Sequence, residues 1–289
     1  MNRGKRDQSI TRRTAIRQMA AGTAGAVAGC KAGYASTPRR PSGMKTIDAH
    51  VHIGDGVRMR HDADSLLKNM DKAGIEFSIV CPMDRHMAVA NREGNDLVLK
   101  AVKMHPDRLA GMAVANPWFG GSAAEEIRRA LGEGLTGVNI HSVLQGFRLA
   151  DHIVDPILEV AAEAGVPIYA HTGTAGVAEP FHLIELARRF PAVNFLMGHA
   201  GASDYYNDAV RGLEFARNVW IESSRNGPAN YCHWQASGAV ERVVFGSSAP
   251  EYIPEIELET LRDVFTETTD LERILAKTIQ QVYRGRLPV

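Results

Sequence analysis

Ile47-Asp48-Ala49-His50-Val51-His52 ends the first apolar run of the chain beyond residue 43. His50 and His52 are two residues apart, so a β-strand would turn both imidazoles to the same side. We predict this first strand over residues 45–51. Seven similar runs predict further strands over residues 76–81, 109–114, 137–141, 166–171, 193–199, 219–223 and 242–247.

Helical stretches are predicted between these runs, over residues 64–73, 88–104, 122–131, 155–164, 181–190, 203–217, 230–237 and 269–283. Strands and helices in strict alternation indicate a parallel sheet of the α/β class. An open doubly wound sheet typically carries a Gly-rich phosphate loop after its first strand, and this chain has none there. We therefore predict one (β/α)₈ TIM barrel over residues 44–289, a length that suits a barrel of roughly 250 residues.

The composition narrows the function classes. The 33 basic and 33 acidic residues balance, but six basic groups and one acid lie in the first 30 residues, so the remainder carries a net charge of −5. A mildly acidic body without a basic patch gives no support for nucleic-acid binding. The three cysteines, Cys30, Cys81 and Cys232, form no CxxC pair. We expect Cys81 in the core, and a disulfide between Cys81 and Cys232 stays open.

The first 43 residues read as a targeting segment followed by a linker. Thr11-Arg12-Arg13-Thr14-Ala15-Ile16-Arg17 resembles a twin-arginine export signal. The mildly apolar stretch over residues 19–29 is too short to span a bilayer but suits the core of a signal peptide. Residues 31–43, rich in Pro, Ser and Arg, then form the linker.

Two cleavage sites compete at the end of this segment. Val27-Ala28-Gly29-Cys30 resembles a lipobox, and cleavage before Cys30 would leave a lipidated cysteine that tethers the protein to a membrane. Cleavage after Ala35 would instead release a soluble protein. We therefore predict either a membrane-anchored lipoprotein or a periplasmic protein.

Five of the eleven histidines lie at or just past predicted strand ends, namely His50, His52, His141, His171 and His199. The carboxyl ends of barrel strands converge on one face, where catalytic groups gather. Three protein ligands with one open position are typical of a catalytic zinc site, and His171 would complete such a set with the first-strand pair. A single strand-end histidine is more often a hydrogen-bonded loop residue. The combination indicates a metal or acid–base site.

Together with the opening motif, His171-Thr172-Gly173 and Gly198-His199-Ala200-Gly201 resemble the amidohydrolase superfamily, in its amidohydrolase-related branch. The resemblance covers roughly residues 45–285 and implies the distorted barrel of metal-dependent hydrolases. It also implies that His50, His52 and His171 bind the metal and that His199 acts on the substrate or the bound water. Asn139 stands where some members have a metal-bridging lysine, so one ion is expected.

The eighth strand departs from the family pattern. Members usually end it Gly-Ser-Asp, where the Asp is a ligand and proton shuttle, but here it reads Gly246-Ser247-Ser248. A serine is a weak ligand and no general base at neutral pH, a loss worth roughly 10²–10⁴ in rate. Glu222 and Glu251 are the candidate carboxylates to replace it. We expect Ser248 in the pocket without a direct bond to the ion.

The resemblance implies a metal-dependent hydrolase or decarboxylase that acts on a small carboxylated or lactone-type molecule. One divalent ion, most simply zinc, is the expected cofactor, and whether the protein forms a homo-oligomer stays open. The candidate catalytic residues are His199, Glu222 and Glu251, and the candidate substrate-binding residues are Arg85, His141, Arg225 and Ser248. Two alternatives remain, a divergent barrel that binds a ligand without turnover and a metal-free lyase.

The export prediction is tested by replacing Arg12 and Arg13 together with lysine. The twin arginines are what the folded-protein export route would read, so the double variant should stay in the cytoplasm. Cell fractionation and immunoblotting check this result. A variant that reaches the envelope as the unchanged chain does would refute the export signal.

Overall fold

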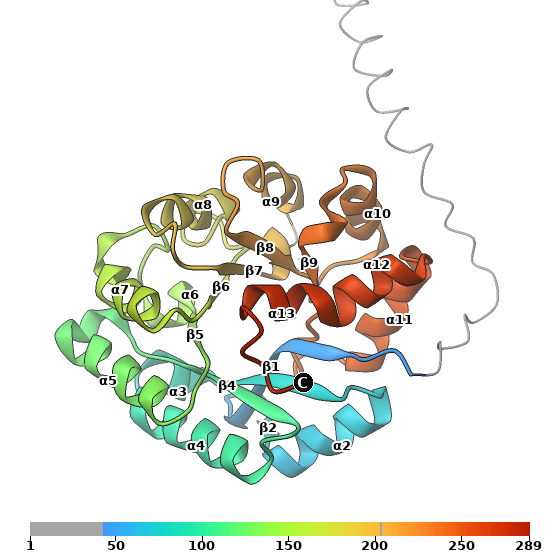
Figure 1. The fold of residues 1–289 in the computed structure, drawn as a ribbon. Coiled ribbons are helices and arrows are strands. Elements are labelled where there is room, and N and C mark those ends of the chain that lie inside the picture. Colours follow the sequence, from blue (N-terminus) through green and yellow to red (C-terminus); the bar gives the residue numbers. More distant parts are fainter. Residues whose placement is uncertain (1–42, 203) are drawn as a thin grey trace, which may run out of the picture.

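The computed structural model describes residues 43–202 and 204–289. The expected export signal, Cys30 and the linker before residue 43 lie outside these residues. A nine-stranded sheet curls into a barrel with helices around its outer face (Figure 1). The eight parallel strands are β1 (Ile47–Asp55), β3 (Phe77–Pro82), β4 (Leu109–Ala113), β5 (Gly137–Ile140), β6 (Ile168–His171), β7 (Phe195–Gly198), β8 (Val219–Glu222) and β9 (Val243–Val244). The TIM-barrel prediction is confirmed.

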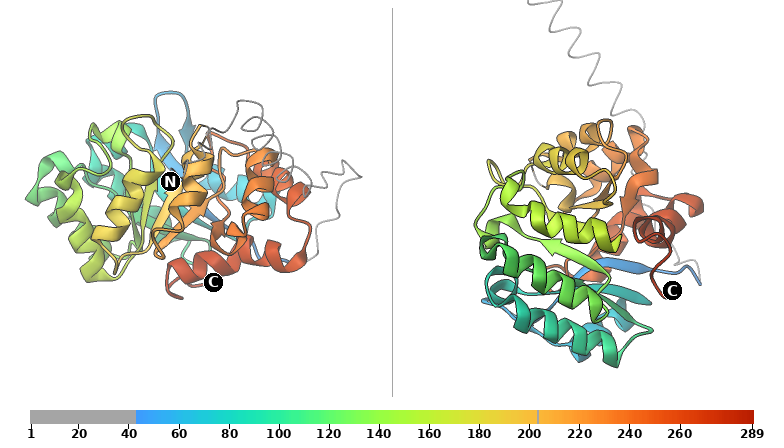
Figure 2. Two further views of the ribbon diagram at one scale, coloured as in Figure 1. Left: turned by 90° about the horizontal axis from the view of Figure 1, so that it is seen from above. Right: turned by 60° about the vertical axis from the view of Figure 1, so that its left-hand side comes forward.

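The ninth strand was not predicted. β2 (Arg60–His61) pairs antiparallel with the end of β1, and Gly54 faces His61 in this hairpin. The hairpin projects from the carboxyl end of the barrel, on the side away from the C-terminal helix (Figure 2). A two-residue strand is too short to leave a periodic signal in the sequence.

The helices follow the predicted order, but some differ in extent and others were not predicted. They are α2 (Ala63–Ala73), α3 (Asp84–Ala88), α4 (Asn91–Met104), α5 (Gly121–Gly132), α6 (Ser142–Gln145), α7 (Asp155–Ala164), α8 (Pro180–Arg189), α9 (Tyr206–Gly212), α10 (Pro228–Ala236), α11 (Pro254–Val264), α12 (Thr268–Glu272) and α13 (Thr278–Val282), with a π-helical stretch at Arg273–Lys277. Among the described residues, no helix is both long and apolar enough to cross a membrane.

The predicted helix over residues 88–104 is wrong at its start, because two helices meet there. Asn91 donates hydrogen bonds to the carbonyls of His86 and Met87 at 2.9 Å each, which satisfies the end of α3 and lets α4 begin in a new direction. The predicted helix over 203–217 shortens to α9. Sequence reasoning also missed α11, although Pro254 supplies a usual start signal.

The barrel closes between β1 and the segment that follows β9. Ala49 donates its amide to the carbonyl of Phe245 at 3.0 Å, Ser248 to His50 at 2.9 Å and His52 to Ala249 at 2.7 Å. Val51 and Ala249 form a parallel bridge. These bonds bring the end of the eighth unit against the strand that carries the histidine pair.

A β-bulge changes which side chains of β1 face the interior. Asp48 is paired with Ser78 and Val51 with Val80, so three steps on β1 match two on β3. Ile47 and Ala49 belong to the inner core before the bulge, whereas Val51 and Ile53 pack on the outer, helix-covered side after it. His50 and His52 are therefore turned inward, as bulges near active sites often re-aim side chains.

The interior of the barrel is filled at its amino end. Phe77, Met112 and Leu196 pack there with the C-terminal residues Ile279 and Tyr283, and all are at most 1% exposed. Figure 1 views this end, with α13 lying across it. Cys81 also lies in this core and is a free cysteine, so the disulfide to Cys232 left open above does not form.

Gly198 tests how tightly the interior is packed. A Cβ on Gly198 would lie 2.5 Å from the ring of Tyr169, which stacks on His50 with centroids 4.0 Å apart. Gly198→Ala should lower the free energy of unfolding by about 1–3 kcal/mol, as overpacked cores do, measured by urea denaturation. Gly132→Ala is the control, because a Cβ there meets nothing within 4 Å. Equal stability of both variants would contradict this packing.

Candidate metal centre

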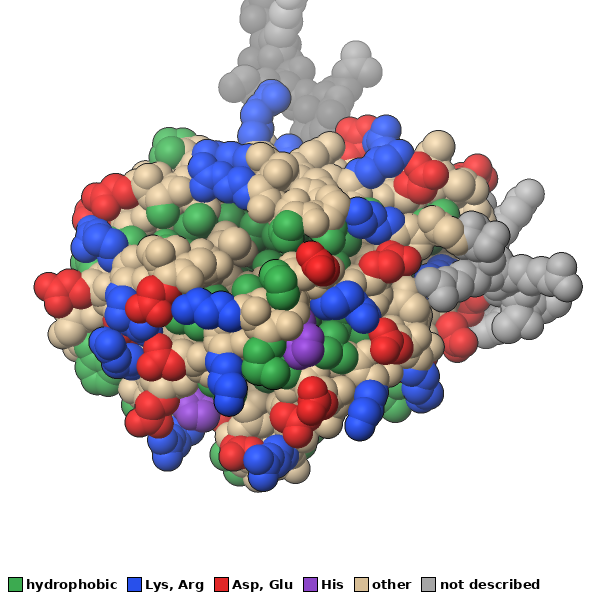
Figure 3. Space-filling view, turned by 60° about the horizontal axis from the view of Figure 1, so that its bottom comes forward, with side chains coloured by type: hydrophobic (Ala, Val, Ile, Leu, Met, Phe, Trp, Pro, Cys, Tyr) green, Lys and Arg blue, Asp and Glu red, His purple; other side chains and the backbone are tan. Residues whose placement is uncertain are grey.

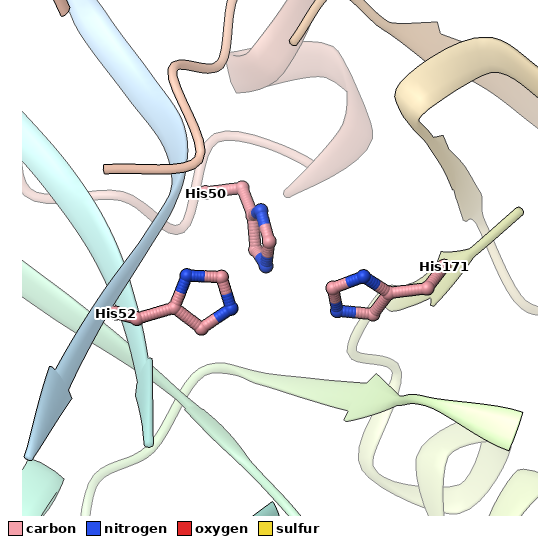
Figure 4. A group of neighbouring side chains, drawn as sticks. All are labelled: His50, His52 and His171. Atoms are coloured by element: carbon pink, nitrogen blue, oxygen red, sulfur yellow. The ribbon is translucent and has the colours of Figure 1, made fainter. Parts of the chain in front are cut away.

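Three buried imidazoles converge at the carboxyl end of the barrel. His50 and His52 come from β1 and His171 from the end of β6, and one ring nitrogen of each lies within 4.8 Å of the others. The three rings point toward a common space (Figure 4). Ring centroids are 4.4 Å apart for His50 and His52 and 4.9 Å apart for His50 and His171. The structure thus brings together the three predicted ligands.

Burial keeps these imidazoles neutral. It lowers the pKa of His52 to about 4 and holds the pKa values of His50 and His171 well below the ordinary histidine range. A neutral imidazole has one nitrogen lone pair free to bind a metal, whereas a protonated ring has none. The site is therefore ready to bind a cation at neutral pH without first losing protons.

The residues fit a divalent ion. Nε2 of His171, which faces the common space, is buried and has no hydrogen-bond partner in the structure (Figure 4). Buried polar atoms are rarely left unsatisfied in proteins. Three imidazole donors and no protein carboxylate among them suit zinc and other ions that accept nitrogen ligands.

His199 lies beside the triad rather than in it. It follows β7 with a left-handed backbone of φ 63°, and its Nε2 is 3.0 Å from Nδ1 of His171. Its backbone amide donates to Glu222 at 3.0 Å, and Asn226 donates to its carbonyl at 2.9 Å. These contacts hold the ring against His171.

A cavity of about 580 Å³ opens above the triad, and Asp84, Tyr252, Val57 and Leu144 belong to its wall. The predicted site residues His52, His141, His171, His199, Arg225 and Glu251 also line it. Burial lowers the pKa of His141 to about 3, so this histidine also stays neutral. Its ring stacks on His171 with centroids 4.0 Å apart.

The other predicted residues lie elsewhere. Arg85 does not line this cavity, because it pairs with Glu93 at 2.6 Å on the exposed surface. Glu222 is fully buried behind His199. Ser248 is 1% exposed, its amide donates to His50, and its hydroxyl has no partner. Ser248 therefore lies against the strand of the histidine pair, and Arg85 is the candidate that the fold places away from the site.

Sequence reasoning missed Arg58, which lines the cavity from the β1–β2 turn. That turn is closed by the amide of Gly56 donating to Met59 at 2.8 Å. Arg225, in the loop after β8, also lines the cavity, and its Nε donates to the hydroxyl of Tyr252 at 3.1 Å. Two arginines near a cation site favour an anionic ligand. Only the hairpin, which the sequence did not reveal, brings Arg58 to the cavity.

The outer surface gives no comparable concentration of one charge in the view of Figure 3. Lysine and arginine side chains alternate there with aspartate and glutamate among the described residues. Alternating surface charges produce a weak net field, in contrast to the basic stripe of a nucleic-acid interface. The cavity is thus the site that the geometry singles out.

Solved structures with the same fold include a 5-carboxyvanillate decarboxylase from Novosphingobium aromaticivorans, complexed with manganese and 4-hydroxy-3-methoxy-5-nitrobenzoic acid. It shares 18% sequence identity over 84% of this chain and 96% of that chain, with a TM-score of 0.67. A 2,6-dihydroxybenzoate decarboxylase from Rhizobium shares 16% sequence identity over 83% of this chain and 99% of that chain, with a TM-score of 0.66.

A probable 2-pyrone-4,6-dicarboxylic acid hydrolase from Acinetobacter baumannii, with citric acid bound, shares 16% identity over 83% of this chain and 100% of that chain, with a TM-score of 0.63. At such identities the likeness shows the fold alone. No curated protein matches the sequence. The family model described as Amidohydrolase matches residues 47–285, which include all of the barrel strands and the three converging histidines, and the chain therefore belongs to the amidohydrolase family.

Proposed function

We propose that this protein is a metal-dependent hydrolase or decarboxylase that acts on a small carboxylated or lactone-type molecule. The observation that carries the proposal is the convergence of His50, His52 and His171 at the base of a cavity that also holds two arginines. A family whose solved structural neighbours include two decarboxylases and a probable pyrone hydrolase supports the reaction classes.

The three histidines would hold one divalent ion, and we propose zinc because their donors are all nitrogen. Such an ion supplies Lewis acidity and lowers the pKa of a bound water. Arg58 and Arg225 would pair with a carboxylate of the substrate, since a guanidinium offers donors in a fork that matches it. His199, which lines the cavity and is held beside His171, would orient the reacting end of the substrate.

Of the two carboxylates that could replace the missing Asp, only Glu251 is placed to reach a substrate. Glu251 lines the cavity, just past the end of the eighth unit. Glu222 has no exposed surface, and both of its oxygens already accept hydrogen bonds. We propose Glu251 as the group that exchanges a proton with the substrate and Glu222 as a supporting residue.

The alternative function is a barrel that binds an anionic ligand without turnover. Ser248 favours it, because a serine at the end of the eighth unit removes the usual anionic ligand and base of the family. The metal site alone does not separate the two functions, since a binding protein can keep its ion. Turnover that chelation abolishes would separate them.

We also propose export, with either a lipidated Cys30 or release after Ala35. The proposal rests on the sequence of the first 43 residues alone. A metal enzyme that folds and binds its ion in the cytoplasm suits a route that carries folded proteins.

Removing one histidine tests the metal site. His52→Ala and His171→Ala should each lower the bound divalent metal from about one equivalent to a small fraction, because two imidazoles hold an ion far more weakly than three. Elemental analysis of the purified variants measures this. His152→Ala, a surface histidine paired with Asp155, is the matched control and should keep the ion.

The same protein is then screened with lactones and aromatic carboxylates, with and without a chelator. Turnover of at least one of them that stops on chelation and returns with zinc is the expected result. Full metal content without any turnover would favour the ligand-binding alternative. Metal loss in the His152 variant as well would mean that the assay does not report on this site.

Ser248→Asp tests the departure from the family pattern. Ser248 has a φ of 57°, a left-handed conformation that Asp and Asn tolerate better than most side chains. The added carboxylate should tighten divalent-metal binding by about tenfold, the scale on which groups around a metal change its affinity. Competition with a chromophoric chelator measures this, and Ser248→Asn is the control of equal size without charge. Equal affinities of both variants would place residue 248 outside the metal site.

A further inference from the structure

A chain of hydrogen bonds runs from a buried carboxylate to a metal-binding histidine. Glu222 Oε2 accepts from the hydroxyl of Ser224 at 2.9 Å, and that hydroxyl lies 2.8 Å from Nδ1 of His199. Nε2 of His199 lies 3.0 Å from Nδ1 of His171. Every member is buried, with exposures from 0% for Glu222 and Ser224 to 7% for His171, so water does not compete along the chain.

The direction of each bond follows from the donors around Glu222. Tyr169 donates its hydroxyl to Oε2 at 2.7 Å, His199 donates its amide to Oε2, and Ser224 donates its amide to Oε1 at 2.6 Å. A carboxylate that receives three other donors acts as an acceptor for the fourth. The single hydroxyl hydrogen of Ser224 is therefore committed to Glu222.

The tautomers of both histidines follow from that commitment. Ser224 Oγ has no second hydrogen, so it must accept one from Nδ1 of His199. A neutral ring that donates from Nδ1 keeps a lone pair on Nε2, and the 3.0 Å between Nε2 of His199 and Nδ1 of His171 fits one donor facing one acceptor. That lone pair faces Nδ1 of His171, which must then be the protonated nitrogen. Nε2 of His171 is left as a lone pair, and it is the atom without a partner in the structure.

We propose that Glu222 is a positioning residue which, through Ser224 and His199, fixes the tautomer of His171 so that Nε2 binds the metal ion. The proposal rests on the metal site of the proposed function. It adds a role for Glu222 and Ser224, which do not line the cavity. Partners of this kind orient a ligand and raise its basicity, and their loss usually weakens metal binding by roughly 10- to 100-fold.

Gly246 shows that the fold leaves room for this carboxylate. A Cβ at residue 246 would lie 2.2 Å from Glu222 Oε1. The glycine lies two residues past β9, the strand that neighbours β8 in the sheet. The carboxylate thus occupies space that a side chain of the adjacent unit would otherwise fill.

Two serines next to each other provide a matched test. Ser224→Ala removes the link to His199, whereas Ser223→Ala removes a buried hydroxyl that contacts only the backbone of Gly246, at 3.2–3.4 Å. Zinc affinity is measured by competition with a chromophoric chelator in the full chain. We expect about a tenfold loss for Ser224→Ala, on the scale of such second contacts, and no loss for Ser223→Ala.

Nitrogen-15 NMR of histidine-labelled, metal-free protein reports the tautomers directly. We expect protons on Nδ1 of both His171 and His199, and loss of the Nδ1 preference of His199 in Ser224→Ala. A proton on Nε2 of either ring in the unchanged protein would overturn the proposal, as would equal zinc affinities of the two serine variants.

The two measurements also separate this proposal from the proposed function. Unchanged protein that binds no divalent ion would refute the metal site, while the NMR spectrum would still decide whether the hydrogen-bond chain has the stated direction. If Ser224→Ala does not fold, the spectrum of the unchanged protein alone decides the proposal.

Discussion

The carboxylate of Asp48 holds together the parts on which the site depends. Its Oδ1 accepts the amides of His50 at 3.1 Å and Ser247 at 2.9 Å. The first bond satisfies an amide inside the bulge of β1, and the second joins β1 to the segment that closes the barrel, 199 residues away in the sequence. Without the bulge, His50 and His52 would not share a face with the inner residues that precede them. Burial removes this carboxylate from water and raises the pKa of Asp48 to about 7.

Much of the architecture was readable from periodicity. The eight parallel strands lie where the apolar runs predict them, and the motif around His50 and His52 predicted three ligands that the fold does bring together. These features depend on local patterns and on the rule that strand ends of a barrel converge. The two-residue spacing predicted that both imidazoles share one side of the strand, but it did not reveal the bulge that turns this side inward.

What the sequence could not reveal depends on long-range contacts. Arg85 was predicted to bind the substrate and Arg58 was not, but the β1–β2 hairpin places Arg58 at the cavity while Glu93 holds Arg85 at the surface. Glu222 was predicted as a catalytic carboxylate because it ends a strand. Its donors come from Tyr169 on β6, His199 just past β7 and Ser224 just past β8, and no local pattern encodes this combination.

The packed core at the amino end of the barrel determines how a ligand can reach the histidines. Tyr283 and Ile279 close that end together with the inner core, so the interior offers no passage through the barrel. A molecule that reaches the histidines must enter past the β1–β2 hairpin and the loop of Arg225, and whatever leaves must retrace that route. Any ligand would therefore enter and leave the cavity through the same opening, past the guanidinium groups of Arg58 and Arg225.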